Sequence, residues 1–323
     1  MENVNEDARS DGRGRSILFV HGRDFKPDRE TLLDISLTAV RAGIERDYPD
    51  CLPAFDSLHS DIAYYGDLNN ELLAAAGRPY DADLDLGDRR NALQAMREIA
   101  VRKSFGIRQY DKLPGKSAVP EFIADFIYPI LGLFGLTMPI INSLSRDFGE
   151  YLRGKSDFSS QVRERVQTSL CDMLDRGDHV MLLTHGSGSV VAYDVLWQLS
   201  HNAELKERFG AIKIDMWVTL GSPLGDRRIR KKLAGAAQKA KAPFPTNVIS
   251  WHNVAAEDDF TCHDKTLADD FRKMMSQRMV SAVTDYRVFN HAVRYGRSNP
   301  HSSVGYYIHP RVSKIISDWI NSA

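Results

Sequence analysis

The chain has 323 residues, of which 43% are hydrophobic and 26% are charged. A chain of this length and composition can bury a substantial core, either as one large α/β domain with an insertion or as two small domains. The formal net charge of −1 argues against a nucleic-acid binder, which usually carries a basic excess. We therefore expect a globular protein that does not bind nucleic acid.

The cysteines and the N-terminal residues bear on location and cofactors. Cys51, Cys171 and Cys262 form no C-x-x-C pair, and their odd number argues against a disulfide framework. No H-E-x-x-H or paired Cys/His spacing indicates a metal site. The first fifteen residues are polar and lack the apolar core of a signal peptide or an anchor. We expect a disordered polar tail over 1–15, a cytoplasmic location, and neither metal nor cofactor.

From residue 16 onward, short apolar runs alternate with segments of helical periodicity, which favours one α/β domain over 16–323. The first expected elements are a strand at 16–20, a helix at 28–46 and a strand within 61–67. The later ones are strands at 179–184, 212–220, 246–255 and 281–289, and helices at 91–103, 159–175, 187–201, 226–240, 264–278 and 311–321. This order predicts a mostly parallel sheet flanked by helices.

An insertion is expected at about 68–158, where the alternation stops. Its most apolar part, 122–141, approaches the ~20 residues that span a bilayer. Pro129 and Pro139 interrupt helical continuity and Asp125 lies inside, so a membrane span is not expected. Two interpretations remain open. The segment is a buried helix pair or a dimer contact, or it is a lid that lines an acyl-binding pocket or contacts a membrane surface.

The most informative segment begins with the apolar run 180–183. A turn of small residues, His-Gly-Ser-Gly-Ser over 185–189, follows it, and an apolar-periodic segment comes next. This pattern predicts strand, turn and helix, the context in which G-x-S-x-G forms a nucleophile elbow. With His185 before the nucleophile and Gly188 two residues after it, the nucleophile position falls on Gly186. A glycine has no side chain with which to attack.

Ser187 is the alternative nucleophile. An elbow needs small side chains two residues before and two residues after the nucleophile, because strand and helix nearly touch there. Counted from Gly186 these are Thr184 and Gly188, whereas counted from Ser187 the first would be the imidazole of His185. One step into the helix also turns the side chain by roughly 100°, away from the position of a nucleophile. The pattern therefore favours Gly186.

Four other segments fit the same arrangement. They are the strand that ends in His21-Gly22-Arg23, the strand and Gly-Ser-Pro-Leu turn over 215–224, the strand over 247–254 that leads into Glu257-Asp258-Asp259, and the Pro-containing loop 299–303 before the C-terminal helix. Together with the elbow, they resemble α/β-hydrolases of the lipase/esterase kind, over roughly 15–66 and 160–321. The chain order of nucleophile position, acid and histidine is the order of that fold.

The resemblance implies a role for each matching residue. His301 would be the general base, and Asp259, or alternatively Asp258, would be the acid that orients it. The backbone of Gly22 and Arg23, with the N–H of Ser187, would form the oxyanion hole.

Other histidines compete with His301 for the role of base. They are His252, His263, His291 and His309. The place of His301 in the loop before the last helix favours it.

The resemblance implies a protein of carboxylic-ester hydrolase lineage that acts on an apolar or lipid-like small-molecule ester, with Gly186 in place of the nucleophile. The alternative is an inactive pseudoenzyme, or a binding or scaffold protein that uses the hydrolase pocket. Contact of 122–141 with a membrane surface, and a homodimer, are further possible partners. The sequence leaves open whether this glycine is natural. Because glycine tolerates a strained elbow, Gly186→Ser is predicted to fold without steric cost.

Overall fold

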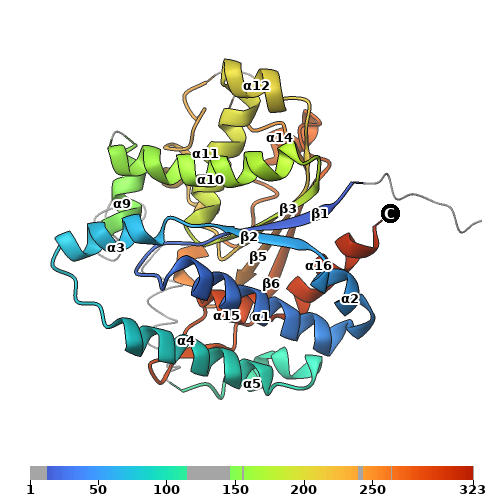
Figure 1. The fold of residues 1–323 in the computed structure, drawn as a ribbon. Helices are drawn as coiled ribbons and strands as arrows, with labels where there is room; N and C mark the ends of the chain where they lie inside the picture. The colour runs from blue at the N-terminus through green and yellow to red at the C-terminus, as the bar shows by residue number, and fades with distance from the viewer. Residues whose placement is uncertain (1–12, 115–145, 155, 239–242, 263, 323) are drawn as a thin grey trace, which may run out of the picture.

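The computed structural model describes residues 13–114, 146–154, 156–238, 243–262 and 264–322. At its centre is a six-stranded sheet in the order β2-β1-β3-β4-β5-β6, and every neighbouring pair is parallel (Figure 1). The strands are β1 (Arg15–Val20), β2 (His59–Ala63), β3 (His179–His185), β4 (Ile214–Leu220), β5 (Val248–Ala256) and β6 (Ala282–Val288). The predicted α/β class with a parallel sheet flanked by helices is confirmed.

Helices cover both faces of this sheet (Figure 1). In chain order they are α1 (Arg29–Asp47), α2 (Leu52–Asp56), α3 (Gly66–Ala75), α4 (Ala82–Arg97), α5 (Ile107–Tyr110), α9 (Arg146–Arg153), α10 (Asp157–Asp175), α11 (Gly188–His201), α12 (Ala203–Phe209), α13 (Arg227–Arg230), α14 (Arg272–Ser276), α15 (Ser303–Tyr307) and α16 (Pro310–Asn321). A short antiparallel hairpin joins β7 (Val293–Arg294) and β8 (Arg297–Ser298).

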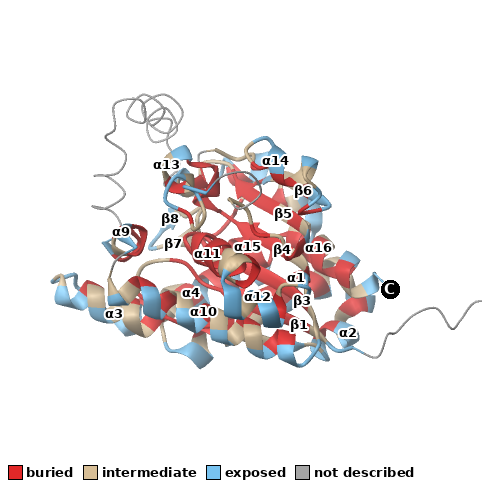
Figure 2. Ribbon diagram, turned by 90° about the horizontal axis from the view of Figure 1, so that it is seen from above, coloured by how far each residue is buried: buried red, intermediate tan, exposed pale blue. Residues whose placement is uncertain are grey.

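The strands are apolar on both faces, as expected where helices cover a parallel sheet from both sides. In β1, Leu18 and Val20 face the core under α10 and α11, whereas Ile17 and Phe19 face the core under α1 and α16. All four side chains are fully buried, because successive side chains of a strand point to opposite faces. Figure 2 shows the same pattern as buried strands between helices whose outer faces are exposed.

The order of the strands determines where a ligand can bind. β2 lies on one side of β1 and β3 lies on the other, so the direction of the chain across the sheet reverses between β1 and β3. In open parallel sheets, ligands bind beyond the carboxyl ends of the strands at such a reversal. The loop after β1 begins at His21 and the turn after β3 contains Gly186, which places both at this point.

Several predicted boundaries need correction. The helices expected at 226–240 and 264–278 are reduced to α13 and α14, and the strand expected within 61–67 ends at Ala63, because α3 already begins at Gly66. The helix expected at 91–103 begins at Ala82 and ends at Arg97. In each case local periodicity misplaced the ends, which tertiary contacts and caps determine.

Two parts of the predicted domain organisation, the N-terminal tail and the insertion, are described only in part. Of the expected tail 1–15, residues 1–12 lie outside the described residues, and Arg15 already belongs to β1. The segment 122–141 also lies outside them. The described part of the expected insertion contributes α4, which packs against α1 and α15, and α9, which packs against α3 and α10. Among the described helices, none is long and apolar enough to cross a membrane.

Candidate functional site

The turn after β3 is tight and depends on two glycines. Gly186 has a φ of +55°, in the left-handed region that side chains disfavour. Its N–H donates to the carbonyl of Leu220 at 2.9 Å, which ties the turn to the end of β4. A Cβ at Gly188 would lie only 2.3 Å from the carbonyl oxygen of His21. Helix α11 therefore meets the end of β1 as closely as the elbow pattern predicts.

The structure brings His301 and Asp259 together beside this turn. The Nδ1 atom of His301 is hydrogen-bonded to Oδ2 of Asp259 at 2.9 Å. A Cβ built at Gly186 would lie 3.0 Å from the other ring nitrogen, Nε2 of His301. Residues from three separate loops thus form one line of contacts, from Asp259 to His301 to Gly186. Asp259 follows β5, His301 precedes α15, and Gly186 follows β3.

Asp259 is only 2% exposed, yet its surroundings favour the charged form of its carboxyl. Burial by itself would raise the pKa of the carboxyl. The positive charge available on His301 and the hydrogen bonds that Asp259 accepts outweigh burial, so the pKa lies below its usual value. Besides His301, the donors are the hydroxyl of Tyr306 at 2.7 Å and the N–H of Thr261 at 2.9 Å.

His185 holds the loop that carries His301. Its Nε2 is hydrogen-bonded to the backbone carbonyl of His301 at 3.0 Å, and the two rings are 4.6 Å apart. Burial, followed by the neighbouring charge of His301, lowers the pKa of His185 well below its usual value. A neutral His185 donates from Nε2 to this carbonyl, and it is a positioning residue.

The predicted oxyanion donors lie beside the same turn. A Cβ at Gly22 would lie 3.5 Å from the backbone nitrogen of Ser187, so the two loops are in contact. Within the described residues, the N–H groups of Gly22, Arg23 and Ser187 donate to no protein acceptor. Unpaired N–H groups from two loops are what an oxyanion hole requires.

His21 fixes the position of the Gly22 loop. Its Nδ1 is hydrogen-bonded to the carbonyl of Gly22 at 2.9 Å, and its Nε2 accepts the N–H of Tyr65 at 3.1 Å. Burial lowers the pKa of His21 to about 3. The neutral ring, with its proton on Nδ1, satisfies both hydrogen bonds.

The alternative acid and the alternative nucleophile lie elsewhere. Asp258 has a φ of +61° and accepts a hydrogen bond from the Tyr110 hydroxyl at 2.9 Å. Ser187 lines a small cavity with Arg23, Tyr65 and residues of α9 and α10, whereas His301 lines a different one. The structure therefore brings Asp259 and Gly186, in preference to these alternatives, to the ring of His301.

The competing histidines have other partners. His252 on β5 is bonded to the Tyr286 hydroxyl at 3.1 Å. His291 is bonded to the carbonyl of Gly106 at 3.2 Å, and His309 accepts the Arg311 N–H as a helix cap at 3.0 Å. The fourth competitor, 263, lies outside the described residues.

The expectation that Gly186→Ser has no steric cost is wrong. A contact of 3.0 Å between Cβ and His301 Nε2 is tighter than ordinary van der Waals contact, and Cε1 lies at 3.2 Å. A serine needs the imidazole to withdraw by a few tenths of an ångström.

A cavity of about 250 Å³ opens beside His301. The residues that line it include Gly22, Arg23, Asp24, Lys26, Arg89, His185, Arg294, Asn299, His301 and Ser302. Sequence reasoning missed its cationic members, because Lys26, Arg89 and Arg294 come from three distant segments. No sequence motif marks them.

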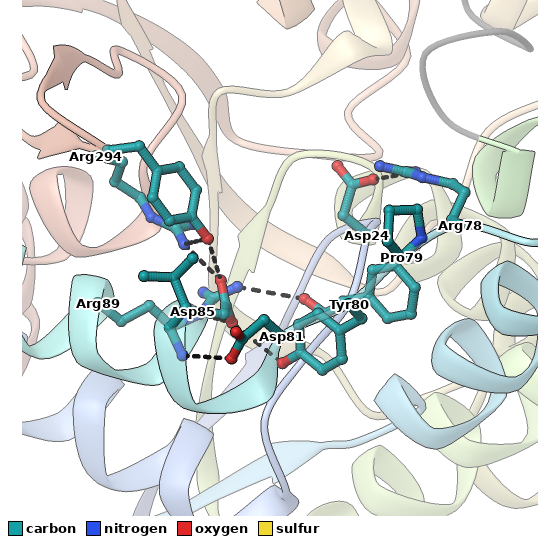
Figure 3. Close-up of a pocket in the computed structure, with 11 residues that line it drawn as sticks. Asp24, Arg78, Pro79, Tyr80, Asp81, Asp85, Arg89 and Arg294 are labelled. Atoms are coloured by element: carbon teal, nitrogen blue, oxygen red, sulfur yellow. Dashed lines mark hydrogen bonds and ion pairs between the residues drawn. The ribbon is translucent and has the colours of Figure 1, made fainter.

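A larger pocket of about 540 Å³ shares Asp24, Arg89 and Arg294 with this cavity. One wall is the ring of Phe25 stacked on Tyr80, with centroids 4.3 Å apart. Figure 3 shows the other wall, where α4 and the β7 hairpin meet through an ion-pair network of their side chains.

A second glycine that sequence reasoning did not single out lies behind the site. A Cβ at Gly221, whose φ is +56°, would lie 2.7 Å from Oδ2 of Asp259 and 3.1 Å from Nδ1 of His301. Only a glycine at position 221 leaves room for the hydrogen-bonded side chains of Asp259 and His301. The Gly-Ser-Pro-Leu turn, which begins at this glycine, was the sequence signal that could have identified it.

Among the described residues, no group of three or more His, Cys, Asp and Glu side chains is arranged to hold a metal ion. Comparison of the chain with protein-family models, curated proteins and solved structures found no match.

Proposed function

We propose that this chain has the α/β-hydrolase fold and belongs to a carboxylic-ester hydrolase lineage of the esterase/lipase kind, with Gly186 at the nucleophile position. The observation that carries the proposal is the line from Asp259 through His301 to Gly186. It combines a 2.9 Å hydrogen bond at Nδ1 with a 3.0 Å approach of Nε2 to the missing side chain. The parallel sheet and the tight turn after β3 support the fold.

The geometry suits acyl transfer once a hydroxyl stands at 186. The serine oxygen would attack the ester carbonyl while Nε2 of His301 takes its proton, and Asp259 would hold the imidazole in the tautomer that leaves Nε2 free. The N–H groups of Ser187 and of the Gly22–Arg23 loop would stabilise the oxyanion. His301 would then return the proton to the leaving alcohol.

A second candidate function follows from Gly186 itself. Without a nucleophile the triad cannot form an acyl-enzyme, so the chain as it stands would bind a ligand in the hydrolase pocket without turning it over through a serine. The free N–H groups and the cavity beside His301 are available for this role.

The test is the single substitution Gly186→Ser, assayed with short neutral nitrophenyl esters and with a fluorophosphonate probe. A triad nucleophile contributes on the order of 10⁶ to kcat, so we expect a gain of at least about 10³ in ester hydrolysis. We also expect a covalent adduct on residue 186.

Two control variants accompany the test. Ser187→Ala in the Gly186→Ser background should leave the adduct on 186, because it retains the Ser187 N–H, whereas His301→Ala in that background should remove the gain. A folded but inert Gly186→Ser chain would favour the binding function. Activity of the original chain that is lost with Ser187→Ala would show that Ser187 is the nucleophile.

The expectation of an apolar or lipid-like substrate depended on 122–141, outside the described residues. Membrane contact through that segment, a homodimer and the cytoplasmic location stay predictions.

A further inference from the structure

The cavity beside His301 is lined with positive charge. Arg23, Lys26, Arg89 and Arg294 line it, and Asp24 is its carboxylate. Asp24 forms an ion pair of 3.0 Å with Arg78. Burial raises the pKa of Asp24, but the charges of Arg23, Lys26 and Arg78 together lower it. The one carboxylate that lines the cavity is therefore shared among three cations.

Two of the four cations are neutralised by α4. Arg89 pairs with Asp85 at 2.7 Å, and Arg294 pairs with Asp88 at 2.8 Å and also with Asp85. Figure 3 shows Asp85 between the two guanidinium groups. This network makes the wall that the two pockets share nearly neutral.

Lys26 contributes charge but no free donor. Its side chain is buried, and its ammonium donates to the backbone carbonyls of Arg23, Asp24 and Phe25. Burial, together with the charge of Arg89, lowers the pKa of Lys26 to about 7. An added anion in the cavity would favour its charged form.

Arg23 is the one guanidinium among the residues lining this cavity that forms no ion pair with a described carboxylate, although its charge acts on the neighbouring Asp24. The only hydrogen bond of the Arg23 side chain in the described part of the chain is a long one, 3.4 Å, from Nη2 to the Thr261 hydroxyl. Its Nε is enclosed and has no partner among the described residues. Asp147 lines a small cavity together with Arg23, and its carboxylate accepts the N–H of Asp24 at 2.7 Å. A buried donor without a partner needs an explanation, such as an absent ligand group.

We propose that the cavity beside His301 binds a carboxylate through Arg23, and that the ester bound at this site carries a free carboxylate near its scissile carbonyl. The part of this proposal that concerns the reaction rests on the function proposed above, whereas the part that concerns binding does not. A guanidinium matches a planar carboxylate with two parallel hydrogen bonds. A guanidinium can pair with phosphate in the same way, but a phosphate dianion brings a second negative charge, and Lys26, whose ammonium donates to backbone carbonyls, offers it no free donor. The proposed substrate class is therefore a monoester of a dicarboxylic acid, which keeps one free carboxylate. This contrasts with the apolar ester expected from sequence.

The neighbouring pocket adjoins the site. It shares Asp24, Arg89 and Arg294 with the cavity, so the two pockets adjoin across the ion-pair wall. The stacked rings of Phe25 and Tyr80 line the neighbouring pocket.

The binding arm of the test uses the chain with Gly186, which has no triad nucleophile to consume an ester. Monomethyl glutarate, neutral dimethyl glutarate and inorganic phosphate are titrated by calorimetry at matched ionic strength. We expect the monoanionic ester to bind at least about tenfold more tightly than the diester, as a hydrogen bond to a charged group implies. Phosphate that binds as tightly as the monoester would overturn the carboxylate assignment.

Arg23→Gln is the decisive variant, because it removes the charge and retains much of the side-chain length. It should abolish the preference for the monoester. The matched control is Arg208→Gln, at an exposed arginine on α12 that pairs with Asp175, and it should retain the preference. If Arg23→Gln does not fold, a salt titration of the unchanged chain replaces it. The preference must then fall as ionic strength rises, and a preference that salt does not change counts against the proposal.

The catalytic arm uses Gly186→Ser and measures the ratio of kcat/KM for the monoester to that for the diester. Arg23→Gln should lower this ratio by about tenfold. An inert Gly186→Ser chain that still shows Arg23-dependent binding would refute the hydrolase function and leave the carboxylate site intact. An active Gly186→Ser chain with no preference for the monoester, before or after Arg23→Gln, would refute the carboxylate site alone.

Discussion

Placing a side chain at residue 186 should destabilise the fold by a small and predictable amount. The φ of Gly186 is +55°, and an L-residue in the left-handed region costs roughly 1–2 kcal/mol. Loss of glycine's flexibility in the unfolded chain returns about 0.4–1 kcal/mol. The 3.0 Å contact with His301 Nε2 adds a further cost, because the ring must move. We expect Gly186→Ala to lower the free energy of unfolding by about 1–2 kcal/mol.

Serine should be tolerated better than alanine at this position. Its hydroxyl can donate to Nε2 of His301, and a net hydrogen bond contributes about 0.5–1.5 kcal/mol. The expected order of stability is glycine, then serine, then alanine, measured by urea denaturation with an unchanged slope. If serine and alanine destabilise equally, the hydroxyl does not reach His301.

His301→Ala separates the backbone cost from the contact cost. In a double-mutant cycle with Gly186→Ala, removing the imidazole should recover the contact part, a coupling of about 0.5–1 kcal/mol. A loss of more than about 4 kcal/mol for Gly186→Ala, or no coupling at all with His301, would refute the local geometry from which the site is inferred.

Three further predictions concern the residues around the site and the core. Gly188→Ala should destabilise the fold by at least about 1–3 kcal/mol, because its Cβ would meet the backbone carbonyl of His21 at 2.3 Å; denaturation that shows a neutral effect contradicts the tight turn. Tyr306→Phe removes a hydrogen bond to Asp259 and so raises the pKa of that carboxyl. Because the stability that Asp259 contributes is lost as pH falls through its depressed pKa, the acid-unfolding midpoint should move to higher pH. For Asp194, the free energy of unfolding depends on pH in the opposite direction. Burial raises the pKa of its carboxyl to about 6, so the folded state binds more protons than the unfolded state. The free energy of unfolding therefore falls as pH rises from about 4 to 6. Asp194→Asn should flatten that pH dependence, and an equally steep decline in the variant would contradict it.

The sequence was sufficient for the fold class and for the turn, because both depend on local patterns. Apolar runs such as 180–183 and the glycines at 186 and 188 are constrained by backbone sterics and by the close approach of strand and helix. Element ends were less predictable. The segments 226–240 and 264–278 have helical periodicity, but only α13 and α14 form within them.

The placement of His301 and Asp259 shows what the sequence could and could not decide. Chain order marked both as candidates, and each follows or precedes a core element. The choice between Asp258 and Asp259 required the structure, since adjacent residues in a turn point in different directions and only coordinates show that Asp259 meets the ring.

The charge of the cavity was decided by tertiary structure alone. Arg23, Lys26, Arg89 and Arg294 come from the loop after β1, from α4 and from the β7 hairpin, and no spacing along the chain connects them. Whether such a cation is neutralised depends on which carboxylates lie within a few ångströms, because Coulomb energy falls with distance. Asp85 reaches Arg89 and Arg294 but not Arg23. The sequence by itself determined the parallel α/β sheet and the tight glycine turn, whereas the unpaired charge beside His301 arises only when the sheet brings distant loops together at its carboxyl edge.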